Sequence, residues 1–171
     1  MNRAVFLDRD GTLNVRPPVH EYVRDVDDFV WLPGSLEALA RLAGAGYLLA
    51  VVSNQRGVAR GLVTEDALRR VEHRMLHDLR AHGGRIDAFR YCVHDLAEGC
   101  DCRKPKPRMV LDLARELDLD LARSWMVGDS DDDVLAGQAA GCRTVLVGGP
   151  PRASRPSLVA RDLAEASLHL V

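Results

Sequence analysis

The feature that most constrains this chain is an apolar stretch, residues 4–7 (AVFL), that runs directly into two carboxylates in Asp8-Arg9-Asp10. The stretch is too short for a helix and rich in strand-forming residues, so it predicts a buried β-strand. Side chains two positions apart on a strand point the same way, which would place Asp8 and Asp10 together at its carboxyl end. Two ionised acids in such a place need a cation or hydrogen-bond donors nearby. An acidic turn after a strand is the simpler alternative, and the rest of the chain decides between them.

The remaining pattern predicts strands that alternate with helices. We expect strands at 47–52, 88–93, 124–127, 143–147 and 158–160, and helices at 35–43, 64–82, 107–117, 130–140 and from 162 onward. Residues 15–30 are polar and contain Pro17-Pro18, so they are expected to form a long loop or flap. This alternation is typical of an α/β fold of Rossmann-like topology, an open parallel sheet with helices on both faces.

The length of the chain favours a single domain that spans residues 1–171 and is large enough to bury a hydrophobic core. The net charge of -2 offers no basic field for a nucleic-acid partner. No apolar run approaches the roughly 18 residues of a membrane span, and the first residues lack the plan of a signal peptide. We therefore expect a cytoplasmic monomer whose partner is a small-molecule substrate, with no membrane or nucleic-acid partner.

Three of the four cysteines lie close together with a histidine between residues 92 and 102. Cys92, His94, Cys100 and Cys102 supply three thiolates and one imidazole, the closed ligand set of a structural Zn²⁺ site. The alternative is a chance cluster of buried cysteines. Cys142 stands apart from this loop and is expected in the core. His73 and His77 lack the glutamate of a metalloprotease motif between them and are interpreted as surface or packing residues.

Polar side chains follow several of the predicted strands at their carboxyl ends, where ligands bind in open parallel sheets. Asp8 could attack phosphorus as a nucleophile, and Asp10 could protonate the leaving alcohol and later deprotonate water. Asp129, with Asp8 and a backbone carbonyl near Asp10, would offer hard oxygen ligands suited to Mg²⁺. The remaining candidates, which would donate to phosphoryl oxygens or add positive charge, are Ser53, Asn54 and Lys104.

These residues resemble the four ordered motifs of the haloacid dehalogenase superfamily of phosphatases. The motifs are Asp8-Arg9-Asp10-Gly11-Thr12, Ser53-Asn54, Lys104-Pro105 and Gly128-Asp129, and the resemblance covers about residues 3 to 148. It implies a capless fold, since no insertion is long enough for a cap domain. It also implies Asp8 as nucleophile, Asp10 as acid/base, Ser53 and Lys104 as phosphoryl stabilisers, and Mg²⁺ held by Asp8, Asp10 and Asp129.

The residues 7–14, 54–61 and 102–105 look in particular like those of the heptose 1,7-bisphosphate phosphatases. That resemblance implies removal of the 7-phosphate, with substrate contacts from Arg9, Thr12, Asn54, Gln55, Arg56, Arg103 and Ser130. Gly57-Val58-Ala59-Arg60-Gly61 and Tyr22-Val23 also look like the heptose enzymes, so we favour heptose bisphosphate as the substrate. Two departures from the heptose enzymes keep the related histidinol-phosphate phosphatases as the alternative. Five residues separate His94 from Cys100, as in those enzymes, and Ser130 stands where heptose phosphatases commonly place a lysine.

Two further hypotheses for the function remain open at this point. A zinc-stabilised binding module that has lost catalysis would carry a broken motif, whereas Asp8, Asp10, Lys104 and Asp129 are all present. A DNA 3′-phosphatase of the same superfamily is disfavoured by the net acidity. The acidic run 131–133 begins a helix and is explained by the helix dipole alone, although Asp133 could also assist the metal or orient Lys104.

Overall fold

The first strand of the chain is buried on both faces and forms the centre of the sheet. In the computed structural model, which describes residues 1–171, all four residues of β1 (Ala4–Leu7) have no exposed surface. Val5 and Leu7 belong to one hydrophobic cluster, while Ala4 and Phe6 belong to another. Because alternate side chains of a strand point to opposite faces, this division means that the sheet is covered on both sides.

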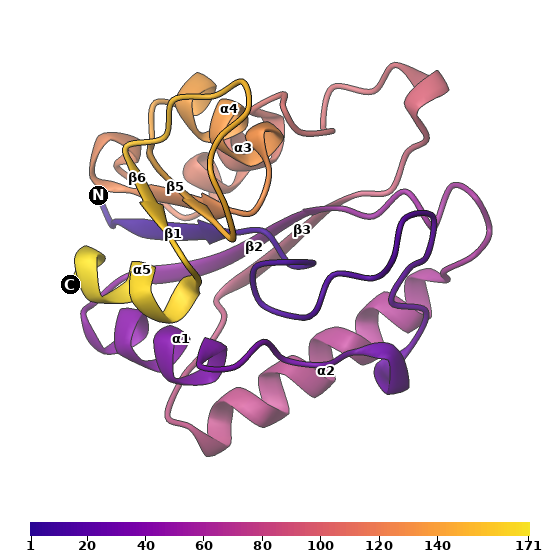
Figure 1. The fold of residues 1–171 in the computed structure, drawn as a ribbon, viewed down its shortest axis with the longest axis horizontal. Coiled ribbons are helices and arrows are strands. Elements are labelled where there is room, and N and C mark those ends of the chain that lie inside the picture. Colours follow the sequence, from indigo (N-terminus) through magenta and orange to yellow (C-terminus); the bar gives the residue numbers. More distant parts are fainter.

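Six parallel strands make one sheet in the order β3-β2-β1-β4-β5-β6. The other strands are β2 (Leu48–Asn54), β3 (Ala88–Cys92), β4 (Trp125–Gly128), β5 (Arg143–Val147) and β6 (Leu158–Ala160). The helices are α1 (Ser35–Gly44), α2 (Glu65–Ala81), α3 (Arg108–Glu116), α4 (Asp131–Ala140) and α5 (Leu163–Leu170). Helices α1, α2 and α5 cover one face of the sheet and α3 and α4 the other (Figure 1).

This architecture confirms the predicted Rossmann-like α/β fold, with every expected strand and helix within a few residues of its predicted bounds. Three short 3-10 helices at Val26–Asp28, Leu96–Glu98 and Leu121–Arg123 were not expected from the sequence. They are too short to carry a hydrophobic period, which is the signal that identifies a helix in a sequence. None of the helices is long and apolar enough to cross a membrane.

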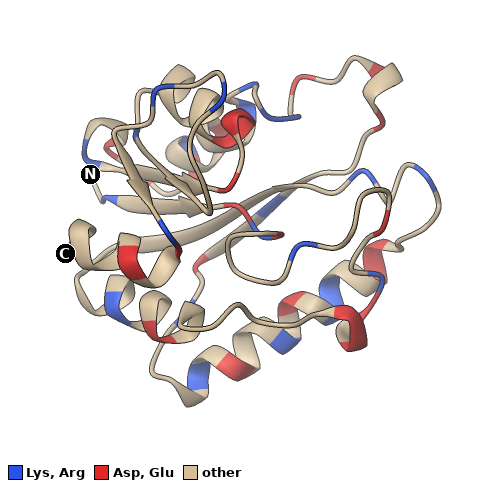
Figure 2. Cartoon of the chain, viewed as in Figure 1, with Lys and Arg blue, Asp and Glu red and all other residues tan.

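The ends of the elements are fixed by local chemistry. The Thr64 side chain accepts a hydrogen bond from Ala67 at the start of α2, and Gly141 ends α4 in the left-handed conformation. Acidic and basic residues alternate along α2, which carries its charges on the outward face (Figure 2). The Arg74–Asp78 pair on this helix has the i,i+4 spacing that adds a few tenths of a kcal/mol, about 0.3–0.5, at an exposed site.

The central place of β1 determines where polar side chains meet. β1 is flanked by β2 and β4, and the strand order reverses beside it, so a crevice opens beyond its carboxyl end. Asp8 follows β1, Ser53 and Asn54 close β2, and Asp129 follows β4. Three segments that are far apart in the sequence therefore meet at one edge of the sheet.

Candidate active site and metal-binding loop

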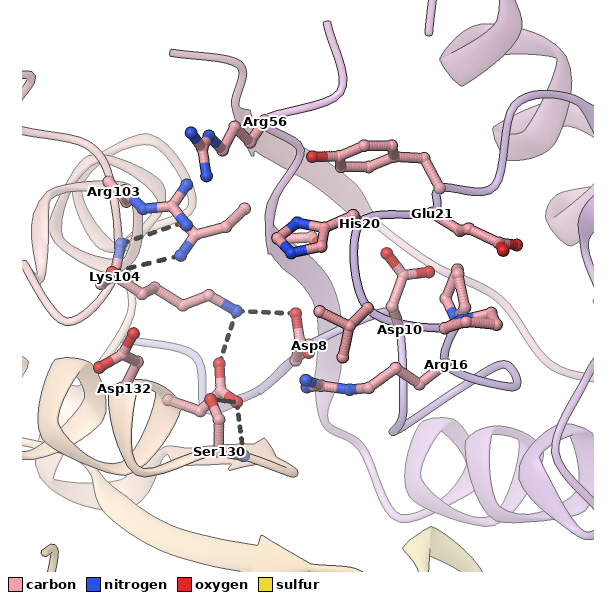
Figure 3. Close-up of a pocket in the computed structure, with 17 residues that line it drawn as sticks. Asp8, Asp10, Arg16, His20, Glu21, Arg56, Arg103, Lys104, Ser130 and Asp132 are labelled. Carbon is pink, nitrogen blue, oxygen red and sulfur yellow. Dashed lines mark hydrogen bonds and ion pairs between the residues drawn. The ribbon is translucent and has the colours of Figure 1, made fainter. Parts of the chain in front are cut away.

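A cavity of about 410 Å³ lies at this edge and is lined by 17 residues, only two of them hydrophobic. Its walls come from the end of β1, the end of β2, the flap, the segment after the cysteine-rich loop, and the start of α4 (Figure 3). Eight of the residues predicted from the sequence to form the site line it: Asp8, Asp10, Ser53, Asn54, Arg56, Arg103, Lys104 and Ser130. The structure therefore brings most of the predicted site residues together in one polar cavity.

Asp8 and Lys104 form a buried ion pair at the base of the cavity. The Lys104 ammonium donates to Asp8 Oδ1 at 2.8 Å and to the Val52 carbonyl oxygen at 2.8 Å, and it lies 2.6 Å from Asp133 Oδ1. Burial disfavours the charged ammonium, but the two carboxylates outweigh it and raise the pKa of Lys104. Lys104 therefore stays a cation, placed where negative charge would gather on a phosphoryl group beside Asp8.

Asp10 also faces the cavity, but its carboxylate is held from behind by three side chains. Arg9 donates to both oxygens at 3.1 Å, Asn14 donates to Oδ1 at 2.9 Å, and Gln55 donates to Oδ2 at 3.0 Å. A carboxylate with so many donors is fixed in one rotamer. Asp10 is thus oriented toward the site by its neighbours, as a proton carrier requires.

Three residues for which we predicted substrate contact lie behind the cavity wall instead of on it. Arg9, Thr12 and Gln55 are almost fully buried, with exposed fractions of 0%, 1% and 2%. Arg9 and Gln55 bond to each other at 3.1 Å and to Asp10, so the geometry supports a role in positioning Asp10. These three residues lie in or next to the catalytic motifs, but sequence position does not show whether a side chain points into the cavity or away from it.

Carboxylate oxygens of Asp8, Asp129 and Asp133 lie within 4.8 Å of one another and could hold a metal ion. Hard oxygen donors on one small volume are what Mg²⁺ requires, so these residues fit the predicted magnesium site. Asp133 enters this group in place of the Asp10 carboxylate, which is turned toward Arg9, Asn14 and Gln55. Ser130 donates through its backbone N–H and its hydroxyl to Asp133 Oδ2, which fixes Asp133 at the first turn of α4.

The stabilisation that Mg²⁺ gives to the protein is expected to be larger at pH 8 than at pH 6. Burial raises the pKa of Asp8 to about 7, although Lys104 opposes this shift, and burial also raises the pKa of Asp129. A metal ion binds the deprotonated carboxylate, so Mg²⁺ affinity should weaken as the pH falls below about 7, by up to roughly tenfold per unit. Melting temperatures with and without Mg²⁺ across this range provide the measurement, and a shift that is equal at both pH values would contradict it.

The cysteine-rich loop brings its four predicted ligands into one cluster. The ligand atoms of Cys92, His94, Cys100 and Cys102 all lie within 4.8 Å of one another. Cys92 Sγ is 3.5 Å from Cys100 Sγ, and His94 Nδ1 is 3.2 Å from Cys102 Sγ. Ligands at the usual zinc bond lengths on a tetrahedron are separated by about 3.3–3.8 Å. The cluster could therefore hold Zn²⁺, as predicted, whereas the separate Cys142 is buried in the core.

Hydrogen bonds that the sequence did not reveal tie the segment that carries the cysteines to the cavity wall. Asp95, next to His94, accepts from Arg56 Nε at 2.9 Å and so fixes a second arginine on the cavity wall besides Arg103. Asn54 accepts from the Lys104 backbone N–H at 3.1 Å and donates to its carbonyl oxygen at 3.2 Å. The loop and the end of β2 thus position Arg56, Arg103 and Lys104 together.

The flap supplies residues that no motif indicated. Arg16, His20, Glu21 and Tyr22 all line the cavity, and His20 has a backbone φ of 70°, which is uncommon for a residue other than glycine. In Figure 3 the Arg16 side chain reaches from the flap toward the side of the cavity that holds Asp8. Arg16 is one of 21 arginines in the chain, so its type carried no signal. The one hint in the sequence is that Arg16 directly follows Asn14-Val15 and so lies only a few residues from Asp8 and Asp10.

Comparison with known proteins gives concordant matches. The model of the HAD-hydrolase-like family matches residues 101–166. A D-glycero-beta-D-manno-heptose-1,7-bisphosphate 7-phosphatase from Pasteurella multocida is 45% identical over 154 residues, covering 86% of this chain and 82% of that protein. The enzyme of the same name from Bordetella bronchiseptica is 38% identical over 180 residues, covering 99% and 98%.

The crystal structure of D,D-heptose 1,7-bisphosphate phosphatase from B. bronchiseptica, complexed with magnesium and phosphate, has the same fold. It superposes with a TM-score of 0.90 at 37% sequence identity, covering 98% of this chain and 97% of that one. A putative HAD-like phosphatase from Mesorhizobium loti superposes with a TM-score of 0.86 at 36% identity, covering 99% and 84%. These two structural matches cover nearly the whole chain and therefore the whole sheet.

Proposed function

Because this chain belongs to the D-glycero-D-manno-heptose-1,7-bisphosphate 7-phosphatases of the haloacid dehalogenase superfamily, we propose that it removes the 7-phosphate of that sugar bisphosphate. The observation that carries the proposal is the identity of 45% to a relative of that name, together with a cavity that holds Asp8, Asp10 and Lys104. That it is a phosphoric monoester hydrolase follows from its family.

The reaction would proceed in two steps through Asp8. In the first, an Asp8 carboxylate oxygen bonds to phosphorus while the bond from phosphorus to the sugar oxygen breaks, and Asp10 gives its proton to that oxygen. In the second, water attacks the aspartyl-phosphate, Asp10 takes a proton from it, and inorganic phosphate leaves Asp8 free again. Arg9, Asn14 and Gln55 hold Asp10 in place through both steps.

Positive charge around the transferring group would come from Lys104 and from a metal. Lys104 is already desolvated and paired, so it needs little reorganisation as charge develops. Mg²⁺, when bound by Asp8, Asp129 and Asp133, supplies further charge neutralisation on phosphoryl oxygens. Arg56 and Arg103 add two cations to the cavity wall and suit a substrate that carries a second phosphate.

The Zn²⁺ site would have a structural role in this scheme. All four ligand positions come from the protein, which leaves none for substrate. The loop would hold Arg103 directly and Arg56 through Asp95. Cysteines that serve as zinc-binding thiolates suit a reducing compartment, so we place the enzyme in the cytoplasm. We also treat residues 1–171 as one phosphatase domain that acts as a monomer.

Histidinol phosphate is the second candidate substrate, favoured by the five residues between His94 and Cys100 and by Ser130. The test is kcat/KM on both anomers of heptose bisphosphate and on histidinol phosphate, side by side. We expect kcat/KM for the better heptose bisphosphate anomer to exceed that for histidinol phosphate by at least about tenfold, since a site built for two phosphate groups penalises a substrate that lacks one of them. A larger kcat/KM for histidinol phosphate would reverse the assignment, and no turnover of any phosphate monoester with Mg²⁺ present would favour a binding module.

A further inference from the structure

Arg16 is the first residue of the flap beyond its paired base. The Val15 N–H donates to the Val30 carbonyl oxygen at 2.8 Å, and Asn14 forms an isolated bridge with Trp31. Pro17 and Pro18 follow immediately and restrict the backbone beyond Arg16. The base of the flap is therefore fixed, and the Arg16 guanidinium can move only within a short distance of the end of β1.

The guanidinium is bound to Asp129, one of the three acids of the candidate magnesium site. Arg16 Nη2 lies 2.5 Å from Asp129 Oδ1, and the Asp129 side chain is only 14% exposed while that of Arg16 is 56% exposed. Gly11 packs directly against this pair, because a Cβ there would lie 1.9 Å from Asp129 Oδ2 and 3.0 Å from Arg16 Nε. The ion pair between Asp129 and Arg16 therefore lies directly against Gly11, where any side chain would clash with it.

The charges of the cluster indicate what happens when a divalent cation arrives. In the deprotonated form that binds a metal, Asp8, Asp129 and Asp133 carry three negative charges, and Lys104 and Arg16 carry two positive charges. Adding Mg²⁺ while Arg16 stays would leave a net positive charge in a largely buried site. If Arg16 leaves, the three acids are balanced by Lys104 and Mg²⁺ alone.

We propose that Arg16 is an internal counter-cation that Mg²⁺ displaces from Asp129, so that metal binding frees the part of the flap that lines the cavity, residues 16–22. This inference rests on the proposed magnesium-dependent function, because it takes Asp129 as a ligand. The freed guanidinium remains in the same cavity. There the dianionic phosphoryl group of a substrate can replace the Asp129 carboxylate as the anionic partner of Arg16. Arg16 is in this sense a positioning residue that links the metal, the flap and the substrate.

The test measures Mg²⁺ binding to the zinc-loaded protein by calorimetry, without substrate. The variant Arg16→Gln should bind Mg²⁺ about tenfold more tightly than the wild type, within the usual range of coupling between two sites. Backbone hydrogen exchange of residues 19–22, which line the cavity between Pro18 and the buried Val23, gives a second readout. Exchange should become faster in the wild type when Mg²⁺ is added, and in Arg16→Gln it should be fast with or without Mg²⁺.

The matched control is Arg24→Gln, which removes an arginine of the same flap that pairs with Asp28 and does not line the cavity. Its Mg²⁺ affinity should equal that of the wild type. Unchanged or weaker Mg²⁺ binding by Arg16→Gln, with normal binding by the wild type, overturns this inference and leaves the proposed function intact. A wild-type protein that takes up no Mg²⁺ overturns both.

Discussion

The variant Asp8→Asn is expected to lose phosphatase activity by about 10⁴-fold or more while remaining folded. An amide is a poor nucleophile, so no aspartyl-phosphate can form, and the residual rate would come from binding alone. The fold should survive because Lys104 keeps Asp133 and the Val52 carbonyl oxygen as partners. The measurement is phosphate release under saturating substrate with Mg²⁺, together with circular dichroism of the purified variant.

The control for Asp8→Asn is Asp66→Asn, which changes an exposed acid at the start of α2 whose side chain is 73% exposed. Its activity should match that of the wild type, which excludes a general effect of losing one carboxylate. Trapping with labelled substrate and acid provides an independent check, since only the wild type should retain covalent phosphate. Substantial turnover by Asp8→Asn would show that another group is the nucleophile.

The variant Lys104→Met should lower activity by roughly 10²–10³-fold, the usual cost of one preorganised donor to developing charge. It should also reduce the free energy of unfolding by about 3–5 kcal/mol, because Asp8 and Asp133 would stay buried without their cation. Denaturant titration and steady-state kinetics measure the two effects. The chain has only one other lysine, and Lys106→Met is the natural control because that side chain is half-exposed and does not line the cavity.

A Lys104→Met protein that is too unstable to assay can be rescued by a second change. Adding Asp133→Asn removes one of the two uncompensated acids, so the double variant should be more stable than Lys104→Met alone. Activity should stay low in both, because the cation beside Asp8 is missing. Equal stability of wild type and Lys104→Met would mean that the buried pair contributes nothing to the fold.

The fold, and the meeting of the acids at the carboxyl ends of β1 and β4, could be predicted from the sequence for simple physical reasons. Buried parallel strands read as short apolar runs, and the acids directly after β1 and β4 had to meet because β1 and β4 are neighbours. The cluster of Cys92, His94, Cys100 and Cys102 was predictable because three thiolates and an imidazole at such short spacing are typical of a structural zinc site. The family matches confirm the predicted phosphatase family.

Other parts of the site depend on where a side chain points, which spacing alone does not determine. Arg9 lies between two predicted catalytic acids, yet it is fully buried and holds Asp10 from behind. Asp133 is the one of three consecutive acids at a helix start for which the sequence suggested a role beside Lys104, and the fold places its carboxylate 2.6 Å from the Lys104 ammonium. Arg16 and Asp95 act through contacts with Asp129 and Arg56 across 113 and 39 residues, respectively, for which a single sequence offers no sign.

The central position of β1 also determines when, during synthesis of the chain, the active site can be completed. The amino-terminal third holds Asp8, Asp10 and Ser53, but their cation, Lys104, and the acids Asp129 and Asp133 emerge from the ribosome much later. Until β4 is added beside β1, the nascent chain lacks Asp129 and Asp133, the two acids that complete the candidate metal site with Asp8. We therefore expect phosphatase activity to begin only when the strands on both sides of β1 are in place.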